Sequence, residues 1–135
     1  MIKIGFICVH NSCRSQMAEA IAKKYFSKKI EAYSAGTHKK DLINQDAVRV
    51  FNEIEKINMN DSHFPKLIDD IPKLDIVITM GCNVNCPNLP SKFREDWGLE
   101  DPTGKEDFEF EKTIQLIKEK MDILVKKIDS KEIVL

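Results

Sequence analysis

The chain has 135 residues, a hydrophobic share of 42% and a formal net charge of −1. This length and composition suit one globular domain with a single core, spanning residues 1–135. Because the charge is nearly balanced, no overall field attracts nucleic acid or an anionic membrane. No segment has the roughly 20 apolar residues of a membrane span. We therefore expect neither nucleic acid nor membrane as a partner, and an anion has to be attracted by a local site.

The chain has four cysteines, and we expect no secretion signal, since the given sequence begins directly with a strand pattern. This usage is typical of a reducing compartment, where cysteines serve chemistry more often than disulfide scaffolds. We expect a cytoplasmic, monomeric protein.

The N-terminal half alternates between strand and helix patterns. An apolar run predicts a strand over Ile2–Val9, and Gln16–Ser27 follows with apolar residues at helical spacing. A second strand is predicted at Ile30–Ser34 and a second helix at Asn44–Ile57. This order is typical of strands that lie parallel in one sheet.

The C-terminal half continues the alternation. We predict a short helical turn at Lys66–Ile71, a strand rich in β-branched residues at Leu74–Met80 and a fourth strand at Phe93–Trp97. The last helix has one apolar face from Phe110 to Ile128, which we interpret as core packing. The whole pattern predicts an α/β fold, a four-stranded, twisted parallel sheet with helices on both faces.

The loop after the first predicted strand carries the strongest chemical signal. Its sequence is Cys8-Val9-His10-Asn11-Ser12-Cys13-Arg14-Ser15. Backbone N–H groups in such a loop, and the N-terminus of the next helix, favour a bound oxyanion and the thiolate form of a cysteine. Arg14 can hold two oxygens of the anion in its planar fork, and Ser15 can donate a hydrogen bond to Cys8.

The residues of this loop differ in their expected roles. We interpret Cys8 as a nucleophile, because an inert core cysteine leaves Arg14 and the polar loop unexplained. Cys13 has no evident chemical task and is expected to pack. His10 either adds positive charge near the anion or lies exposed on the loop, and we favour the exposed position.

A second cysteine pair, Cys82 and Cys86, comes after the third predicted strand with three residues between its members. Parallel strands end at one edge of a sheet, so Cys82 and Cys8 are expected at the same edge. The pair could supply two zinc ligands, but structural zinc usually needs four and no second close pair lies outside the loop. It could also consist of unreactive thiols. We favour a redox relay, since the turn-forming residues around Pro87 suit a mobile segment, and we expect no metal.

Four segments resemble the low-molecular-weight protein tyrosine phosphatases and, more closely, their relatives the thioredoxin-coupled arsenate reductases. They are Asn11–Glu19, Tyr33–Gly36, Val77–Met80 with the cysteines after it, and Trp97–Lys105. They run over nearly the whole chain in the family's order. The resemblance implies a phosphatase-like fold, arsenate or a phosphate-like oxyanion as substrate and no bound cofactor. It also implies that thioredoxin, or another thiol system, supplies the reducing equivalents.

The resemblance implies roles for individual residues. Cys8 attacks arsenic, and Asp101 is the general acid, with a pKa that the neighbouring anion can raise. Cys82 then attacks the Cys8 sulfur, and Cys86 takes over the disulfide for reduction by thioredoxin. Two features depart from the family: the well-known enzymes separate the relay cysteines by a longer segment, and close relatives often have glycine in place of His10.

The resemblance also implies residues that support the loop. Asn11 shapes its backbone in a left-handed conformation, which asparagine tolerates. Glu19 and Ser34 match a polar cluster beneath the loop that binds potassium in some relatives. Lys66 replaces the acidic residue that would complete the ion site, so its ammonium would stand in for the cation. The alternative is a solvated surface lysine.

Two other functions remain open. A tyrosine phosphatase acting through a Cys8 phosphoenzyme would use the same loop and Asp101. However, the phosphatases carry aromatic residues where this chain has Thr103-Gly104-Lys105, and they have no use for the second cysteine pair. Weak hydrolysis of aryl phosphates is still expected. A thiol sensor or arsenite-binding module would use the cysteines as soft ligands and would need no Asp101.

Overall fold

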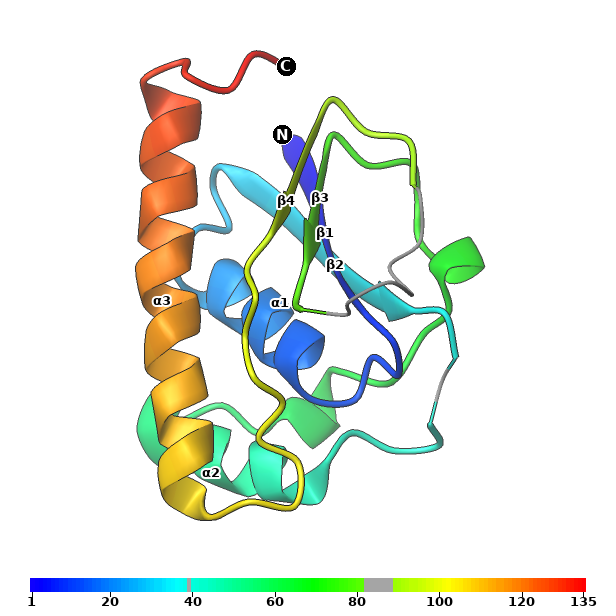
Figure 1. The fold of residues 1–135 in the computed structure, drawn as a ribbon, viewed down its shortest axis with the longest axis vertical. Coiled ribbons are helices and arrows are strands. Elements are labelled where there is room, and N and C mark those ends of the chain that lie inside the picture. Colours follow the sequence, from blue (N-terminus) through cyan, green and yellow to red (C-terminus); the bar gives the residue numbers. More distant parts are fainter. Residues whose placement is uncertain (39, 82–88) are drawn as a thin grey trace.

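The computed structural model describes residues 1–38, 40–81 and 89–135. The strands of its parallel sheet are Ile2–Cys8 (β1), Ile30–Gly36 (β2), Ile76–Thr79 (β3) and Phe93–Asp96 (β4). The α-helices are Arg14–Tyr25 (α1), Gln45–Glu55 (α2) and Asp107–Asp129 (α3), and the short 3-10 helices are Met59–Asp61 (η1) and Ile68–Asp70 (η2). The predicted α/β fold with a four-stranded parallel sheet is confirmed (Figure 1). No helix in the described ranges combines the length and apolar character needed to cross a membrane.

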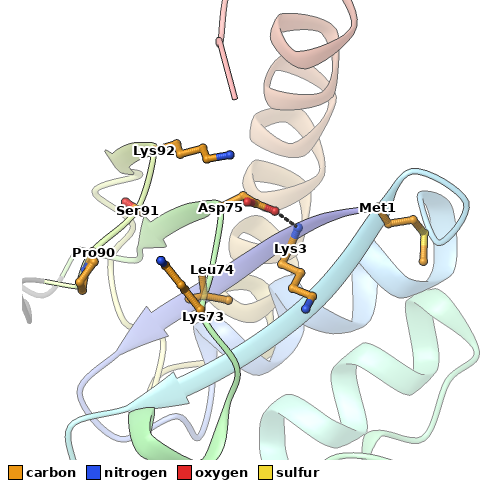
Figure 2. A pocket seen from close by; sticks show the side chains of 8 residues that line it. All are labelled: Met1, Lys3, Lys73, Leu74, Asp75, Pro90, Ser91 and Lys92. Carbon is orange, nitrogen blue, oxygen red and sulfur yellow. Dashed lines mark hydrogen bonds between the residues drawn. The ribbon is translucent and has the colours of Figure 1, made fainter.

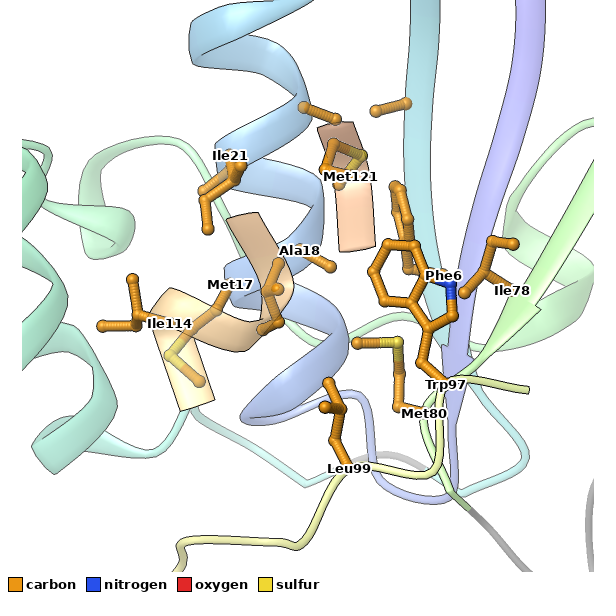
Figure 3. Close-up of a cluster of buried hydrophobic side chains, with 14 of the residues drawn as sticks. Phe6, Met17, Ala18, Ile21, Ile78, Met80, Trp97, Leu99, Ile114 and Met121 are labelled. Atoms are coloured by element: carbon orange, nitrogen blue, oxygen red, sulfur yellow. The ribbon is translucent and has the colours of Figure 1, made fainter. Parts of the chain in front are cut away.

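All three α-helices contribute to the main core on one face of the sheet. Phe6 of β1 and Ile78 of β3 are fully buried there, and Figure 3 shows them in one cluster with side chains of α1 and α3. The rings of Phe6 and Trp97 pack with their centroids 5.7 Å apart. The predicted apolar face of the last helix is core, since its positions from Phe110 to Leu124 are buried.

The opposite face of the sheet has a smaller core and a different cover. Successive residues of a strand point to opposite faces, so Ile7 and Val77 lie in a second cluster apart from Phe6. Ile68 of η2 packs against this cluster. Among the described residues, the helix on this face is therefore the 3-10 helix η2, in the region where a helical turn was predicted, and the α-helices share the other face.

The ends of several elements differ from prediction by a few residues. β2 continues to Gly36, two residues further than predicted, since Gly36 pairs with Cys8. α1 begins at Arg14 because Met17 N already donates to Cys13 O at 3.0 Å. η1 was not predicted.

The strand order β2-β1-β3-β4 brings the ends of β1 and β3 together. From β1 the chain first adds β2 on one side of β1 and later adds β3 on its other side. The order in which strands are added therefore reverses between β1 and β3. Such a switch point is where ligands bind in open parallel sheets. Ile7 pairs with Thr79, and Met80 N donates to Ile7 O at 3.1 Å. The loop after β1 and the segment after β3 therefore leave the sheet side by side.

Gly36 lets the end of β2 pass directly against the loop after β1. A Cβ atom at this position would lie 2.5 Å from Val9 O and 3.0 Å from Asn11 N. Both are backbone atoms, which cannot rotate away as a side chain can. The path of the loop therefore depends on the absence of a side chain at residue 36.

We predict that Gly36→Ala lowers the free energy of unfolding by about 1–3 kcal/mol, because the added methyl group forces the backbone apart. Urea denaturation measures this loss. Gly104→Ala is the control, since a Cβ atom at Gly104 meets nothing within 4 Å and strains only a backbone with φ of 79°. An unchanged urea midpoint in Gly36→Ala would contradict the prediction.

Candidate active site

The loop between β1 and α1 turns its carbonyl oxygens toward the body of the protein. Val9 O accepts from His38 N at 2.9 Å, and Ser12 O accepts from Asn44 N at 2.7 Å. In a trans peptide the N–H group of the following residue points the opposite way, toward the concave side of the loop. α1 begins at Arg14, and its first-turn N–H groups have no partners within the helix. These N–H groups together form a cradle for an oxyanion.

Asn11 fixes the bend of the loop. Its φ is 51°, the left-handed conformation predicted for it, and its side chain is fully buried. Asn11 Oδ1 accepts from Gln16 Nε2 at 2.9 Å and from Lys66 N at 2.8 Å. Asn11 Nδ2 donates to Ser15 Oγ at 2.9 Å. One side chain thus ties the loop to the helix that comes after it and to the segment that carries Lys66.

Cys8 lies at the end of β1 with its sulfur 2.9 Å from Ser15 Oγ. Because Ser15 Oγ already accepts from Asn11, its own hydroxyl proton is free to donate to the Cys8 sulfur. Cys8 is only 5% exposed, so this donor acts on a sulfur that is largely shielded from water. The structure thus places a hydroxyl group directly against the sulfur of the predicted nucleophile.

Arg14 is anchored by the backbone of two other segments. Its Nη1 atom donates to Met80 O and Leu99 O, both at 2.7 Å. Its Nη2 atom is 3.9 Å from Asp101 Oδ2. Nη1 of the guanidinium group is therefore bonded to the protein itself. The edge formed by Nε and Nη2 is the part that can bind an oxyanion.

Asp101 lies beside Arg14, and its pKa is below the usual range. Partial burial alone raises the pKa of this carboxyl group, but two hydrogen bonds from Thr103 and the positive charges of Arg14 and Lys40 outweigh it. Asp101 Oδ1 accepts from Thr103 N at 3.1 Å and from Thr103 Oγ1 at 2.7 Å. The predicted raising of this pKa concerns the site with an anion bound and stays a prediction. The negative charge of a bound oxyanion would act in the opposite direction.

These groups surround a pocket of about 240 Å³ at the switch point of the sheet. Its lining residues are Cys8, Val9, His10, Ser12, Cys13, Arg14, Lys40, Asp101 and Thr103. His10 is exposed at the rim, the position favoured from the sequence, and its ring centroid is 6.5 Å from that of His38. The structure thus brings the described residues of the predicted catalytic loop together with Asp101 from a distant part of the chain.

A larger hollow of about 650 Å³ lies at the opposite edge of the sheet (Figure 2). Lysine side chains line much of it, and Asp75 Oδ2 accepts from Lys3 N at 2.9 Å. None of the described residues that line it is a cysteine or histidine. We therefore place the chemistry in the smaller pocket beside Cys8.

Cys13 is chemically distinct from Cys8 although both belong to one loop. Burial raises the pKa of the Cys13 thiol to about 12, and the nearby Asp101 and Cys8 add to the effect. Its side chain lies in the main core. A thiol with this pKa stays protonated at neutral pH, which agrees with the packing role expected from the sequence.

A polar cluster lies beneath the loop around the buried carboxylate of Glu19. Burial alone raises the pKa of Glu19, but the charges of Lys66 and Lys23 and the hydrogen bond from Ser34 Oγ outweigh it and lower the pKa. Lys66 Nζ is 3.5 Å from Glu19 Oε1, and its side chain is 14% exposed. Lys66 is thus a member of the cluster, and the alternative of a solvated surface lysine is wrong.

Several contributors to the site were not singled out from the sequence. Gln16 Nε2 donates to Asn11, and Lys40 and Thr103 act on Asp101. The spacing of Asp101 and Thr103 is typical of a turn in which an aspartate side chain accepts from the backbone two residues on, so it could have been found. Nothing in the local sequence points to Lys40.

The predicted relay residues Cys82 and Cys86 lie in 82–88, outside the described residues. Gly81, directly before them, is described, and its N–H group donates to Asp96 Oδ1 at 2.9 Å. In the part of the chain that the structure describes, no group of three or more His, Cys, Asp or Glu side chains is placed to hold a metal ion.

Comparison with known proteins gives consistent matches over nearly the whole chain. Residues 3–133 match the low molecular weight phosphotyrosine protein phosphatase family. An arsenate reductase of Staphylococcus xylosus is 40% identical over 122 residues, which cover 85% of this chain and 89% of that protein. A solved arsenate reductase in the phosphate binding state superposes with a TM-score of 0.82 at 34% identity, over 95% of this chain and 99% of that chain. The thioredoxin-dependent arsenate reductase of Corynebacterium glutamicum gives a TM-score of 0.76 at 32% identity, with 97% of this chain matched to 63% of that chain.

We predict that iodoacetamide at pH 8 alkylates Cys8 in the folded protein and spares Cys13. A thiol with a pKa of about 12 is ionised to about one part in ten thousand at pH 8, so Cys13 lacks the reactive thiolate. Fragmentation of the peptide spanning residues 4–14 by mass spectrometry assigns the label. Unfolding in urea is the control, because it should make Cys13 reactive. Labelling of Cys13 before unfolding would contradict the prediction.

Proposed function

We propose that this chain, which belongs to the low molecular weight phosphotyrosine protein phosphatase family, reduces arsenate to arsenite with Cys8 as the nucleophile. The observation that carries the proposal is the cradle around Cys8, where the Ser15 hydroxyl contacts the sulfur and Arg14 and Asp101 face one pocket. A site of this kind binds a tetrahedral oxyanion against a thiolate. The relatives named arsenate reductases support the same substrate.

The first step forms a bond between sulfur and arsenic. Arsenate lies on the N–H groups of the loop, with Arg14 opposite its oxygens, and the Cys8 thiolate attacks arsenic(V). One As–O bond breaks, and the departing oxygen takes up protons and leaves as water. Asp101 supplies a proton to this oxygen once the bound anion has raised its pKa. The product of the step is a thioester of arsenate on Cys8.

The second step uses the cysteine pair that comes after β3. Cys82 attacks the Cys8 sulfur, an S–S bond forms, and the S–As bond breaks with its electron pair on arsenic, which leaves as arsenite. Cys86 then attacks Cys82 and frees Cys8 as a thiolate. Two thiols have thereby been oxidised to one disulfide, and the two electrons have reduced arsenic(V) to arsenic(III). The neighbouring ends of β1 and β3 support this order, since Cys82 is the residue directly after Gly81.

The external reductant is a dithiol protein of the thioredoxin kind, which exchanges with the Cys82–Cys86 disulfide. The thioredoxin-dependent relative from Corynebacterium glutamicum supports this choice. A reducing compartment such as the cytoplasm keeps the three reactive thiols in the state that the reaction needs. The reaction requires one copy of the chain, and we place it in a monomer with no bound cofactor.

Phosphatase activity is the second candidate, because phosphate and arsenate have the same shape and charge. The Cys8 loop and Asp101 would serve both reactions through a covalent intermediate on Cys8. Asp101 and Pro102 are followed by Thr103, whose side chain bonds back to Asp101 and offers no aromatic ring to a phenyl ester. We therefore expect weak hydrolysis of aryl phosphates as a side reaction, and the acid in the pocket favours catalysis over a sensor role.

Lys66 takes the place of a cation beneath the loop. Its ammonium group neutralises Glu19, while its backbone N–H group donates to Asn11. One residue thus supplies both the charge and the contact that shape the loop.

We predict that arsenate reduction has the same rate in KCl and in NaCl of equal ionic strength, since Lys66 provides the charge a potassium ion would supply. Lys66→Ala should lower the free energy of unfolding by about 1–3 kcal/mol, because the buried Glu19 loses part of its compensation. Lys28→Ala, at an exposed position, is the control. Marked activation of the unmodified protein by potassium over sodium would contradict the proposal.

The relay is tested by arsenate-dependent oxidation of NADPH in the presence of thioredoxin and thioredoxin reductase. We predict no turnover in Cys8→Ser. Cys82→Ser should complete at most the first step, with arsenic held on Cys8, because no thiol then attacks the Cys8 sulfur to release arsenite. Cys86→Ser should also stop turnover, since the disulfide cannot reach the second pair. Cys13→Ala is the matched control and should retain most of the activity.

Steady arsenate reduction by Cys82→Ser would rule out the relay. Hydrolysis of phosphate esters that needs Cys8 alone, without any arsenate turnover, would make the protein a phosphatase. Full biological effect of Asp101→Asn would instead favour a thiol sensor.

A further inference from the structure

The carboxylate of Asp96, at the end of β4, joins two segments of the chain. Its Oδ1 atom accepts from Thr79 Oγ1 at 2.6 Å and from Gly81 N at 2.9 Å. Its Oδ2 atom accepts from Gly98 N at 3.1 Å. Hydrogen bonds to an ionised carboxylate are among the stronger ones in proteins. One side chain therefore holds the end of β3 against the turn after β4.

Both segments lead to residues with proposed chemical roles. Gly81 directly precedes Cys82, and Gly98 lies three residues before Asp101. The two segments are in close backbone contact, because a Cβ atom at Gly81 would lie 2.9 Å from Leu99 O. Gly81 and Gly98 have φ values of 98° and 58°, which glycine adopts without strain. The backbone conformation of both segments thus allows the close contact that the Asp96 carboxylate holds together.

Arg14 holds the same two segments from the side of the active site. Its Nη1 atom bonds Met80 O, one residue before Gly81, and Leu99 O, one residue after Gly98. Asp96 and Arg14 therefore act as two clamps on a single junction. If the Asp96 clamp is lost, the carbonyl groups that orient Arg14 are free to separate, and Asp101 moves with Leu99.

The position of Asp96 is not explained by core packing. Its side chain is exposed, whereas Trp97 next to it is buried and bonds Thr79 O through its backbone at 2.8 Å. Asp96, Arg14 and Asp101 line one hollow of about 510 Å³ that adjoins the pocket of Cys8. An exposed carboxylate that joins two such segments is suited to orienting them.

We propose that Asp96 is a positioning residue for the reaction: its carboxylate fixes the segment leading into Cys82 against the segment carrying Asp101, and so holds Arg14 and Asp101 at the bound oxyanion. The inference rests on the proposed roles of Asp101 and Cys82. Asp96 does not touch the substrate, and its effect is transmitted through these residues.

The test is a double-mutant cycle on arsenate reduction with Asp96→Ala, Asp101→Asn and the combined variant. Asp96→Ala is expected to lower kcat by about tenfold or more, because a displacement near 1 Å is costly in a positioned site. In the Asp101→Asn background, Asp96→Ala is expected to lower kcat by a smaller factor than it does in the unmodified protein, because part of its effect passes through Asp101. Asp96→Asn, which keeps one oxygen acceptor, is expected to lose less.

Asp75→Ala is the matched control. Asp75 also accepts a backbone N–H group from a neighbouring segment, Lys3 at 2.9 Å, but at the opposite edge of the sheet. It should keep the kcat of the unmodified protein. Amide hydrogen exchange at residues 98–103 should become faster in Asp96→Ala and stay unchanged in Asp75→Ala. Additive losses of kcat in the cycle, or unchanged exchange at 98–103, would overturn the inference.

A failure of the proposed function can be distinguished from a failure of the inference about Asp96. If the unmodified protein reduces no arsenate, the reductase proposal fails, and the cycle is then measured on aryl phosphate hydrolysis, where Asp96 is expected to act through Asp101 in the same way. If neither substrate is turned over, hydrogen exchange decides. Faster exchange at residues 98–103 in Asp96→Ala then supports the clamp, and unchanged exchange rejects it.

Discussion

Asn11 holds a left-handed backbone inside the protein and uses both polar atoms of its side chain to do so. Its oxygen accepts from Gln16 and from the backbone of Lys66, and its nitrogen donates to Ser15. Because Ser15 Oγ accepts the last of these bonds, its own proton is free to donate to the Cys8 sulfur. An aspartate in its place would have no N–H group to donate, so Ser15 would lose the partner that orients it. The side chain of Asn11 therefore fixes both the bend of the loop and the position of the Ser15 hydroxyl that contacts Cys8.

The charges around the loop are arranged in two layers. Beneath it, Glu19 is ionised and compensated by Lys66 and Lys23, so a buried negative charge is fixed on the side away from the pocket. Burial lowers the pKa of His63 and keeps this ring neutral next to Glu19. Above the loop, the N-terminus of α1 and Arg14 present positive charge. The loop thus lies between a buried carboxylate, whose charge is neutralised by lysines, and a positively charged surface that favours a bound anion.

The periodicity of the sequence was sufficient for the alternation of elements and for the parallel sheet, because apolar spacing is a local property. The end of β2 at Gly36, in contrast, depends on pairing with Cys8, which is distant in the sequence. The same division holds at the site. Cys8, Arg14 and Ser15 are adjacent in sequence, so their grouping was predictable. The low pKa of Asp101 depends first on Thr103, which a local pattern contains, whereas the smaller contribution of Lys40 comes from about sixty residues away and no local pattern contains it.

The anion cradle alone does not distinguish a reductase from a phosphatase, since both need a thiolate, a cationic clamp and an acid. The covalent intermediates differ in the group that removes them: water attacks phosphorus in a phosphoenzyme, whereas a second thiol has to reach the Cys8 sulfur in an arsenic thioester. Access to this sulfur is a property of topology. The strand order places the end of β3 beside Cys8, and Arg14 and Asp96 tie that end to the segment of Asp101. We therefore attribute the choice of reaction to the cysteine proposed to follow Gly81 in the relay, whereas the cradle would serve either reaction.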